Sequence, residues 1–211
     1  MNSRIDHIVI GTDNLDSGTK ILETKLNTKF SLGGEHKVMG THNKLLKLQS
    51  NIYIEVIANN SNVSKPSRQR WFSLDESSIK EKIEKSPRLL CWVLEVDNIE
   101  DTVEKCGYNP GEIIQLSRDE LTWKVTVPSN GKLVENGVLP VLIEWPSNQH
   151  PSKKLNNSKV SISKISLFHP EPYKIKNIIS NLISSDLIYI TEGFPKMELI
   201  LTTQNEKVII D

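Results

Sequence analysis

The sequence is poor in the features that mark several classes of protein. It has two cysteines, Cys91 and Cys106, in 211 residues. These are too few for a disulfide framework and fit a reducing cytoplasm. No apolar run approaches the roughly 18 residues of a membrane span, and no secretory signal precedes the strand-like run that begins at Ile5. The chain also lacks a nucleophile elbow, a Cys-x-x-Cys pair and a phosphate-binding glycine loop.

The chain also has a formal net charge of zero. The 26 lysines and arginines balance 26 acidic residues, which argues against nucleic acid or an anionic membrane as the main partner. Hydrophobic residues make up only 37% of the chain. A chain of this length nevertheless buries roughly 70% of its unfolded surface and holds a real core.

The first 60 residues predict one β-α-β-β-β unit. Residues 5–10 are a short β-branched strand, and Asn14 is the expected N-cap of a helix that ends near Asn27. The glycines at 33–34 and Gly40 predict hairpin turns among the strands that follow. These strands are expected around residues 30–32, 42–48 and 52–57.

The same pattern then starts again. The sequence Asp13-Asn14-Leu15-Asp16 recurs as Asp97-Asn98-Ile99-Glu100, again after an apolar strand, and Gly107 is a good stop for the second helix. Two copies of one unit usually pack as a pseudo-symmetric pair. The predicted organisation is a first βαβββ module at 1–60, a connector at 61–87, a second βαβββ module at 88–150, and a partial module or appended layer at 151–211.

Ionisable residues inside apolar strands are the main functional signal. Glu55 and Glu144 hold matching places in the last strand of each module, and His7 lies in the first strand, on the same face as Ile5. A buried carboxylate must be protonated, paired or bound to a metal. Two interpretations stay open. Either the glutamates face solvent on the outside of the sheet, or the three residues form a metal site of nitrogen and oxygen ligands.

Several short motifs follow one another in order: Ile5-Asp6-His7-Ile8-Val9, Gly40-Thr41-His42-Asn43, Tyr53-Ile54-Glu55-Val56-Ile57, Arg70-Trp71-Phe72, Ser117-Arg118 and Ile143-Glu144-Trp145. Together they resemble the glyoxalase-like branch of the vicinal oxygen chelate superfamily, over residues 4 to about 150. The resemblance implies an α+β fold of paired βαβββ modules that form a cup-shaped mixed sheet. An additional C-terminal βαββ-like segment follows the pair.

The resemblance also implies a set of metal ligands, because metal-using members take them from the first and last strands of both modules. Carried over, these are His7 and Glu55 from the first module and Glu144 from the second. The fourth position is Cys91, which lies in an uninterrupted apolar strand and is expected to be inert core. Three protein ligands and a water would still leave the open site that catalysis uses.

Histidines and Glu144 supply the candidate proton carriers. Glu144 or His42 is expected to move a proton on the substrate, and His42 is also a candidate for the missing ligand. His36 lies in a polar turn and is expected at the surface. His150 and His169, each followed by proline, are expected to be simple loop-end residues.

Four residues are predicted to bind substrate. Asn43 belongs to the motif that contains His42, and Trp71 and Trp145 would line an apolar pocket, although aromatic side chains at strand spacing also fit a plain core. Arg118 would hold a carboxylate or phosphate with two hydrogen bonds. Three other arginines have the same chemistry, and the sequence does not show which of them converge: Arg68, Arg70 and Arg88.

Three functions are compatible with these features. The first is an isomerase or lyase that uses a divalent zinc, manganese, nickel or iron ion on a small oxygen-chelating substrate; a ring-cleaving dioxygenase would require His42 as a ligand. The second is a metal-free protein that sequesters drugs or other small molecules. The third is an interaction module in which Glu55 and Glu144 face solvent. Two modules can close the cup within one chain, and exchange of modules between chains would give a homodimer.

Overall fold

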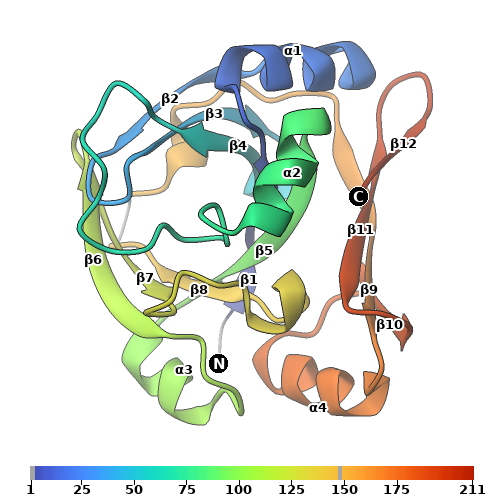
Figure 1. The fold of residues 1–211 in the computed structure, drawn as a ribbon. Helices are drawn as coiled ribbons and strands as arrows, with labels where there is room; N and C mark the ends of the chain where they lie inside the picture. The colour runs from blue at the N-terminus through green and yellow to red at the C-terminus, as the bar shows by residue number, and fades with distance from the viewer. Residues whose placement is uncertain (1–2, 147–148) are drawn as a thin grey trace.

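The computed structural model describes residues 3–146 and 149–211 (Figure 1). In these ranges the chain forms an eight-stranded sheet, a four-stranded sheet and four α-helices. The first sheet contains β1 (Ser3–Gly11), β2 (Ser31–His36), β3 (Thr41–Lys47), β4 (Tyr53–Asn59), β5 (Arg88–Val96), β6 (Glu112–Arg118), β7 (Leu121–Val127) and β8 (Val141–Glu144). The second contains β9 (Ser161–His169), β10 (Ile188–Glu192), β11 (Lys196–Thr202) and β12 (Lys207–Ile210). The helices are α1 (Leu15–Leu26), α2 (Ser77–Lys85), α3 (Ile99–Lys105) and α4 (Pro172–Leu182).

The eight-stranded sheet is built from two copies of one unit. Its strand order is β2-β3-β4-β1-β5-β8-β7-β6. The first strand of each copy pairs in parallel with the last, β1 with β4 and β5 with β8, and the two copies meet where β1 and β5 run antiparallel. The α+β fold of paired βαβββ modules is therefore confirmed. The sheet curls until its two edge strands, β2 and β6, touch each other (Figure 1).

Equivalent caps start the helices of the two modules. The side-chain oxygen of Asn14 accepts hydrogen bonds from the backbone N–H groups of Asp16 and Ser17, and that of Asn98 accepts one from Asp101. The recurrent Asp-Asn element of the sequence thus marks two equivalent helix starts. None of the helices in the described ranges has the length and apolarity needed to cross a membrane.

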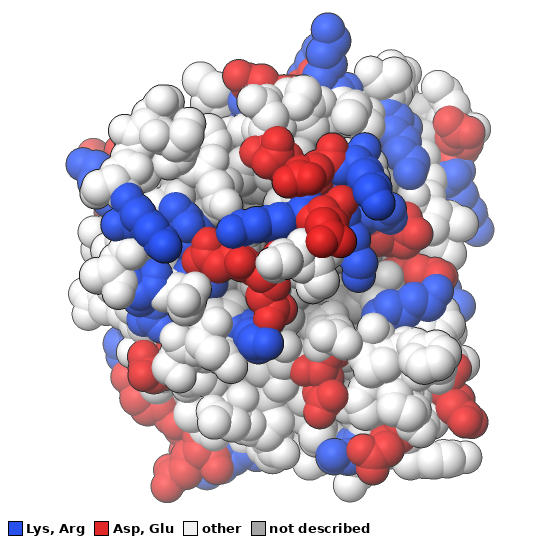
Figure 2. Space-filling view, viewed as in Figure 1, with Lys and Arg blue, Asp and Glu red and all other residues white. Residues whose placement is uncertain are grey.

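The curled sheet has a separate apolar core on each side. On the outer side, Ile8, Ile54 and Trp92 pack with side chains of α1, α3 and the second sheet. On the inner side, Val9 and Val93 belong to another cluster that includes three aromatic residues of the concave wall. On the face seen in Figure 2, basic and acidic side chains are intermixed, as the zero net charge leads one to expect.

A β-bulge interrupts β1 at Asp6. The pairing of β1 with β5 shifts between Ile5 and His7, so Asp6 is an extra residue in the strand. As a result, Ile5 packs in the outer core with Ile8, whereas His7 faces the inside of the curl. The prediction that Ile5 and His7 share a face is wrong, because it assumed an unbroken alternation of side chains.

The glycines at 33–34 are also placed differently from the prediction. They lie inside β2, and the hairpin turn comes later, at Gly40, which has φ of 59°. A Cβ atom on Gly33 would lie 1.9 Å from Oδ1 of Asn43, and one on Gly34 would lie 2.5 Å from Cδ of Arg118. These glycines therefore allow two polar side chains to approach the backbone of β2.

The C-terminal sheet lies against the outer side of the first sheet (Figure 1). Its strand order is β10-β9-β11-β12, and β9 pairs in parallel with β10, the strand that follows α4 directly. In both modules of the first sheet, the parallel partner of the first strand is instead the last strand. The C-terminal segment thus has a topology of its own, and it forms a layer on the side away from the concave wall.

Candidate functional site in the cup

A small cavity, called the cup here, lies inside the curl of the first sheet and is lined by both modules. Its free volume is about 30 Å³, room for about two water molecules. The polar side chains of the wall are His7, His36, Asn43, Glu55 and Arg118, and the aromatic ones are Tyr53, Trp71, Phe72, Trp123 and Trp145.

His7 is oriented by the buried carboxylate of Asp6. The bulge places Asp6 so that its Oδ1 forms a hydrogen bond with Nδ1 of His7. Its Oδ2 lies 2.8 Å from Nε2 of His150 and accepts a hydrogen bond of 2.9 Å from Nε1 of Trp145. Burial alone would raise the pKa of Asp6, but the hydrogen bonds with His150 and His7 outweigh it and hold this pKa well below its usual range. Nε2 is therefore the nitrogen of His7 that is left for the cup.

Glu55 is the partner of His7 inside the cup. Its Oε2 lies 3.5 Å from Nε2 of His7, and its Oε1 accepts a hydrogen bond from Nδ2 of Asn43. Burial opposes the charge on His7, but Asp6 and Glu55 outweigh it and raise the pKa of His7 to about 9. Burial likewise opposes the charge on Glu55, yet His7 and Asn43 lower the pKa of Glu55 to about 2. Without a bound cation the two residues form a buried ion pair at neutral pH.

His36, Asn43 and Arg118 form a second polar group on the Oε1 side of Glu55. Nη1 of Arg118 donates to Oδ1 of Asn43 at 3.2 Å and to Nε2 of His36 at 3.4 Å. Nε2 of His36 lies 3.9 Å from Oε1 of Glu55. Burial lowers the pKa of His36 to about 4 and keeps the imidazole neutral. The prediction of an exposed His36 is wrong, because β2 runs on through the two glycines and carries this residue into the cup.

Glu144 lies outside the cup. Its Oε2 accepts a hydrogen bond of 2.7 Å from the backbone N–H of Ile99 at the start of α3, and its Oε1 lies 3.6 Å from Nζ of Lys124. Its neighbours Ile143 and Trp145 line the cup instead. The structure therefore does not bring Glu144 together with His7 and Glu55.

The strand register explains the position of Glu144. In the first module Val9 pairs with Glu55, and in the second module the equivalent Val93 pairs with Val141. The residue of β8 that corresponds to Glu55 is therefore Val141, three positions before Glu144. A shift by an odd number of residues moves a side chain to the other face of the sheet.

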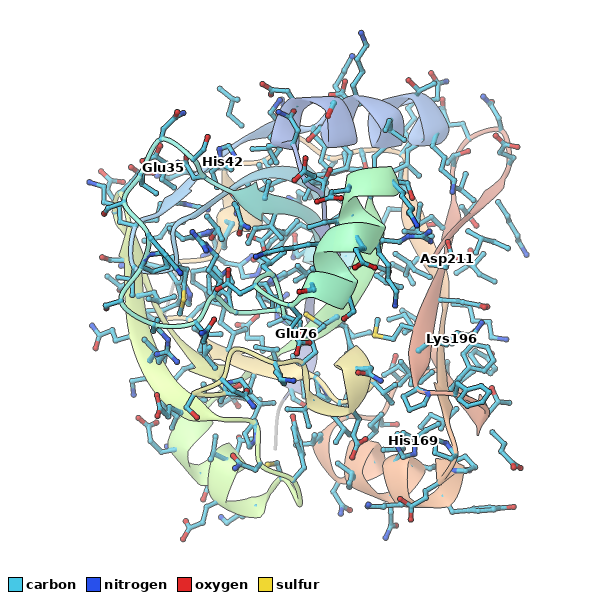
Figure 3. The ribbon with its side chains drawn as sticks, viewed as in Figure 1. Glu35, His42, Glu76, His169, Lys196 and Asp211 are labelled. Atoms are coloured by element: carbon cyan, nitrogen blue, oxygen red, sulfur yellow. The ribbon has the colours of Figure 1, made fainter. Side chains whose placement is uncertain are left out.

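His42 and Cys91 do not contribute ligand atoms to the cup either. His42 is half-buried on the opposite side of β3 from Asn43, and it lies beside Glu35 in Figure 3. Cys91 is completely buried next to Val9. Burial raises the pKa of its thiol well above the ordinary value, which disfavours the thiolate that a metal would need.

The four predicted substrate-binding residues, in contrast, all line the cup: Asn43, Trp71, Arg118 and Trp145. The sequence does not reveal the contributions of Asp6, His36 and His150 to this region: Asp6 stands in an apolar strand, His36 in a polar stretch typical of a turn, and His150 before a proline, yet His150 pairs with Asp6. The Gly40-Thr41-His42-Asn43 motif is the one feature of the sequence that points to His36, because His36 lies in the strand that pairs with this motif in the hairpin. His169 is buried at the end of β9, in the C-terminal layer (Figure 3), and its Nε2 lies 3.2 Å from Oε2 of Glu135.

One compact group of acidic and histidine ligand atoms is present in the described part of the chain. Atoms of Asp6, Glu95 and His150 lie within 4.8 Å of one another. This group lies on the Nδ1 side of His7, away from the Nε2 that faces the cup, and Oδ2 of Asp6 already accepts a hydrogen bond from Nε1 of Trp145. Within this group, His150 is the residue that pairs with Asp6, with its Nε2 2.8 Å from Oδ2.

The buried ion pair of His7 and Glu55 predicts a pH optimum for the stability of the metal-free protein. The charge on His7 stabilises the fold fully below its ordinary pKa of 6.5, and this contribution is lost as pH rises through about 9. The charge on Glu55 stabilises the fold above 4.5 and is lost as pH falls through about 2. We expect the melting temperature to decline from pH 6.5 to 9, and to decline less in a His7→Gln variant. An equal decline of melting temperature with pH in the wild type and in His7→Gln would contradict a charged His7 in the fold.

A family model described as a glyoxalase-like domain matches residues 5–183 of the chain. The chain belongs to the glyoxalase-like domain family. The match covers the whole cup and continues through α4, so the family domain includes the first part of the C-terminal layer. The resemblance seen in the sequence motifs is thereby confirmed.

Several solved structures are similar to this chain. A hypothetical protein from Staphylococcus aureus is 20% identical, with a TM-score of 0.55 over 99% of this chain and 85% of that one. Methylmalonyl-CoA epimerase from Mycobacterium tuberculosis is 15% identical, with a TM-score of 0.43 over 67% of this chain and 87% of that one. The likeness to the Staphylococcus aureus protein, at this low identity, shows the fold alone. No curated protein matches this glyoxalase-like chain at a significant level.

Proposed function

We propose that this glyoxalase-like protein is an isomerase or lyase that acts on a small oxygen-bearing substrate in the cup, with a divalent metal ion held by His7 and Glu55. The 3.5 Å between Nε2 of His7 and Oε2 of Glu55 is the main support. Two ligands that each bind an ion at about 2.1 Å, at a tetrahedral angle, lie about 3.4 Å apart. A nitrogen and an oxygen donor suit zinc, manganese, nickel and iron.

The residues around the pair fit the same role. Metal-binding histidines usually donate their other ring N–H to a carboxylate, and Asp6 is in that position on His7. Asn43 occupies Oε1 of Glu55 and leaves Oε2 for a cation. Both candidate ligands come from the first module, so water and substrate oxygens would complete the coordination. A bound divalent ion would supply Lewis-acid stabilisation of negative charge on those oxygens.

The chain's own residues would move the proton. Glu144 and His42, the carriers expected from the sequence, lie outside the cup. We assign this role to His36, because its Nδ1 lies 3.1 Å from Oγ1 of Thr41 and its Nε2 faces the cup, where it would give up its long hydrogen bond from Arg118 to take the proton. The aromatic side chains around it exclude water from the reacting atoms.

Metal titration tests the proposal directly. We expect the wild-type protein, purified without affinity-tag metal, to bind about one zinc or manganese ion per chain. Glu55→Gln should weaken that binding about 100-fold, since a charged ligand is replaced by a neutral amide of the same size; this corresponds to about 2.7 kcal/mol. Glu144→Gln is the matched control and should bind the ion as the wild type does.

Two results would count against a metal enzyme. One is a wild type that binds none of zinc, manganese, nickel and iron(II), and the other is unchanged affinity in Glu55→Gln. The second candidate function, a metal-free binding protein, would then remain. The observation that favours it is that the charges of His7 and Glu55 already balance each other within the cup.

A further inference from the structure

We infer that the molecule bound in the cup carries a carboxylate group, and that Arg118 and Trp71 bind it. The inference rests on the proposed function, because it names the substrate class of the same cup. It concerns the Oε1 side of Glu55, away from the position proposed for the metal ion.

The first observation is an arginine without an anionic partner. The chain has five arginines, and in the described residues four have a carboxylate within 4.0 Å. Arg118 does not; its hydrogen bonds go to the neutral groups of His36 and Asn43. A half-buried guanidinium whose remaining N–H donors are uncommitted is suited to a carboxylate, which it can bind with two parallel hydrogen bonds. The four paired arginines are Arg4 with Glu95, Arg68 with Glu112, Arg70 with Asp75, and Arg88 with Asp211.

The second observation is a buried N–H group without an acceptor. Trp71 is 4% exposed and lines the cup, and its Nε1 has no hydrogen-bond partner among the described residues. Buried donors in native proteins are normally satisfied. Trp71 and Arg118 both contact His36: the rings of Trp71 and His36 are 5.0 Å apart, and Arg118 donates to Nε2 of His36. Both groups can only donate, so a ligand that contacts both would have to supply acceptor oxygens.

The other side chains of the cup indicate what the rest of the ligand would be like. The rings of Trp123 and Trp145 lie 5.3 Å apart and form an apolar wall. Asn43 links Arg118 to Glu55, since its Oδ1 accepts a hydrogen bond from Arg118 and its Nδ2 donates one to Glu55. A carboxylate on Arg118 would therefore sit close to the His7 and Glu55 end. These lining side chains suit a small carboxylic acid with an apolar or aromatic body, which would enlarge the present free volume of about 30 Å³ on binding.

Intrinsic tryptophan fluorescence can measure such binding, because three of the four tryptophans of the chain line the cup. The probes are benzoate and phenylglyoxylate, each compared with its neutral amide, on metal-free wild-type protein. We expect each acid to bind at least about tenfold more tightly than its amide. Arg118→Gln should remove this preference by weakening the acid and leaving the amide unchanged. Arg88→Gln, at an arginine paired with Asp211 outside the cup, is the control and should keep it.

Two further variants protect the test against a folding artefact. Trp71→Phe keeps an aromatic wall but removes the N–H, and should lower acid affinity about threefold. Gly34→Ala keeps the guanidinium but forces it to move, because the added Cβ would lie 2.5 Å from Cδ of Arg118, and should also lower acid affinity. Melting curves of each variant show that the fold is retained.

The inference is overturned if acid and amide bind the wild type equally, if neither acid binds saturably, or if Arg118→Gln keeps the preference. Inorganic phosphate that competes as strongly as benzoate would overturn the assignment of a carboxylate. Metal titration of the wild type, set beside its acid and amide affinities, separates the two proposals. Normal metal binding in a wild type without acid preference contradicts only the carboxylate site. Acid preference in a wild type that binds no metal contradicts only the metal enzyme.

Discussion

Asp6→Asn is expected to lower the free energy of unfolding by about 3–5 kcal/mol, because it breaks a buried charged network. Asp6 is fully buried, and its two oxygens face ring nitrogens of His7, His150 and Trp145. Asparagine keeps the shape but has one acceptor oxygen, and its amide would point N–H groups at other N–H groups. Urea unfolding of the metal-free protein measures the loss.

The exposed Asp13 offers a matched control for this substitution. Asp13→Asn changes the same charge outside any buried network and should alter stability by less than about 0.5 kcal/mol. The same Asp6→Asn protein should bind metal about 10-fold to 100-fold more weakly, because Asp6 orients His7. A loss of stability below about 1 kcal/mol would show that the carboxylate is not required to hold this network together.

Trp92→Ala is the second substitution with a large expected effect, about 3–5 kcal/mol. Trp92 is completely buried in β5, at the centre of the outer core, where side chains of both modules and of the C-terminal layer meet. Its Nε1 donates a hydrogen bond of 2.9 Å to the carbonyl oxygen of Val138. The variant would leave a cavity and a buried carbonyl without a donor.

Two comparisons make the Trp92 experiment specific. Trp92→Phe retains most of the volume and should cost clearly less than alanine in urea unfolding. Tyr173→Ala removes another large aromatic residue, but one that is 87% exposed, and should change stability by less than about 0.5 kcal/mol. Similar losses for Trp92→Ala and Tyr173→Ala would mean that the three parts of the chain do not share one core.

The sequence predicted the elements of the fold better than their register. The Asp-Asn repeat located both helix starts, since an N-cap depends only on a side chain and the next few backbone N–H groups. The position of Glu144 depends instead on how β8 pairs with β5, and an apolar run with a glutamate in it is compatible with either face. The bulge at Asp6 is likewise a property of the pairing between β1 and β5, so alternation along β1 could not reveal it.

The candidate site was predicted in part for the same reason. His7 and Glu55 lie in strands that the sequence identified, and the structure brings them together. His36 enters the cup only because β2 continues through two glycines, and His150 reaches Asp6 from beyond the end of β8. Contacts between segments so far apart leave no periodic pattern in the chain. The substrate-binding candidates were found through motifs, and the structure singles out Arg118 from the other arginines by its lack of a carboxylate partner.

The curl of the first sheet also determines how a molecule can reach the cup. The free space holds about two waters, so a larger molecule can enter only if the wall moves. β2 and β6 are the two ends of the sheet and, in the described residues, share no ladder of main-chain hydrogen bonds; the side chain of Arg118 in β6 joins them through its hydrogen bond to His36 in β2. This seam can part without breaking a strand pair. A carboxylate ligand held by Arg118 and Trp71 would lie behind this seam, so its residence time would depend on how often β2 and β6 separate.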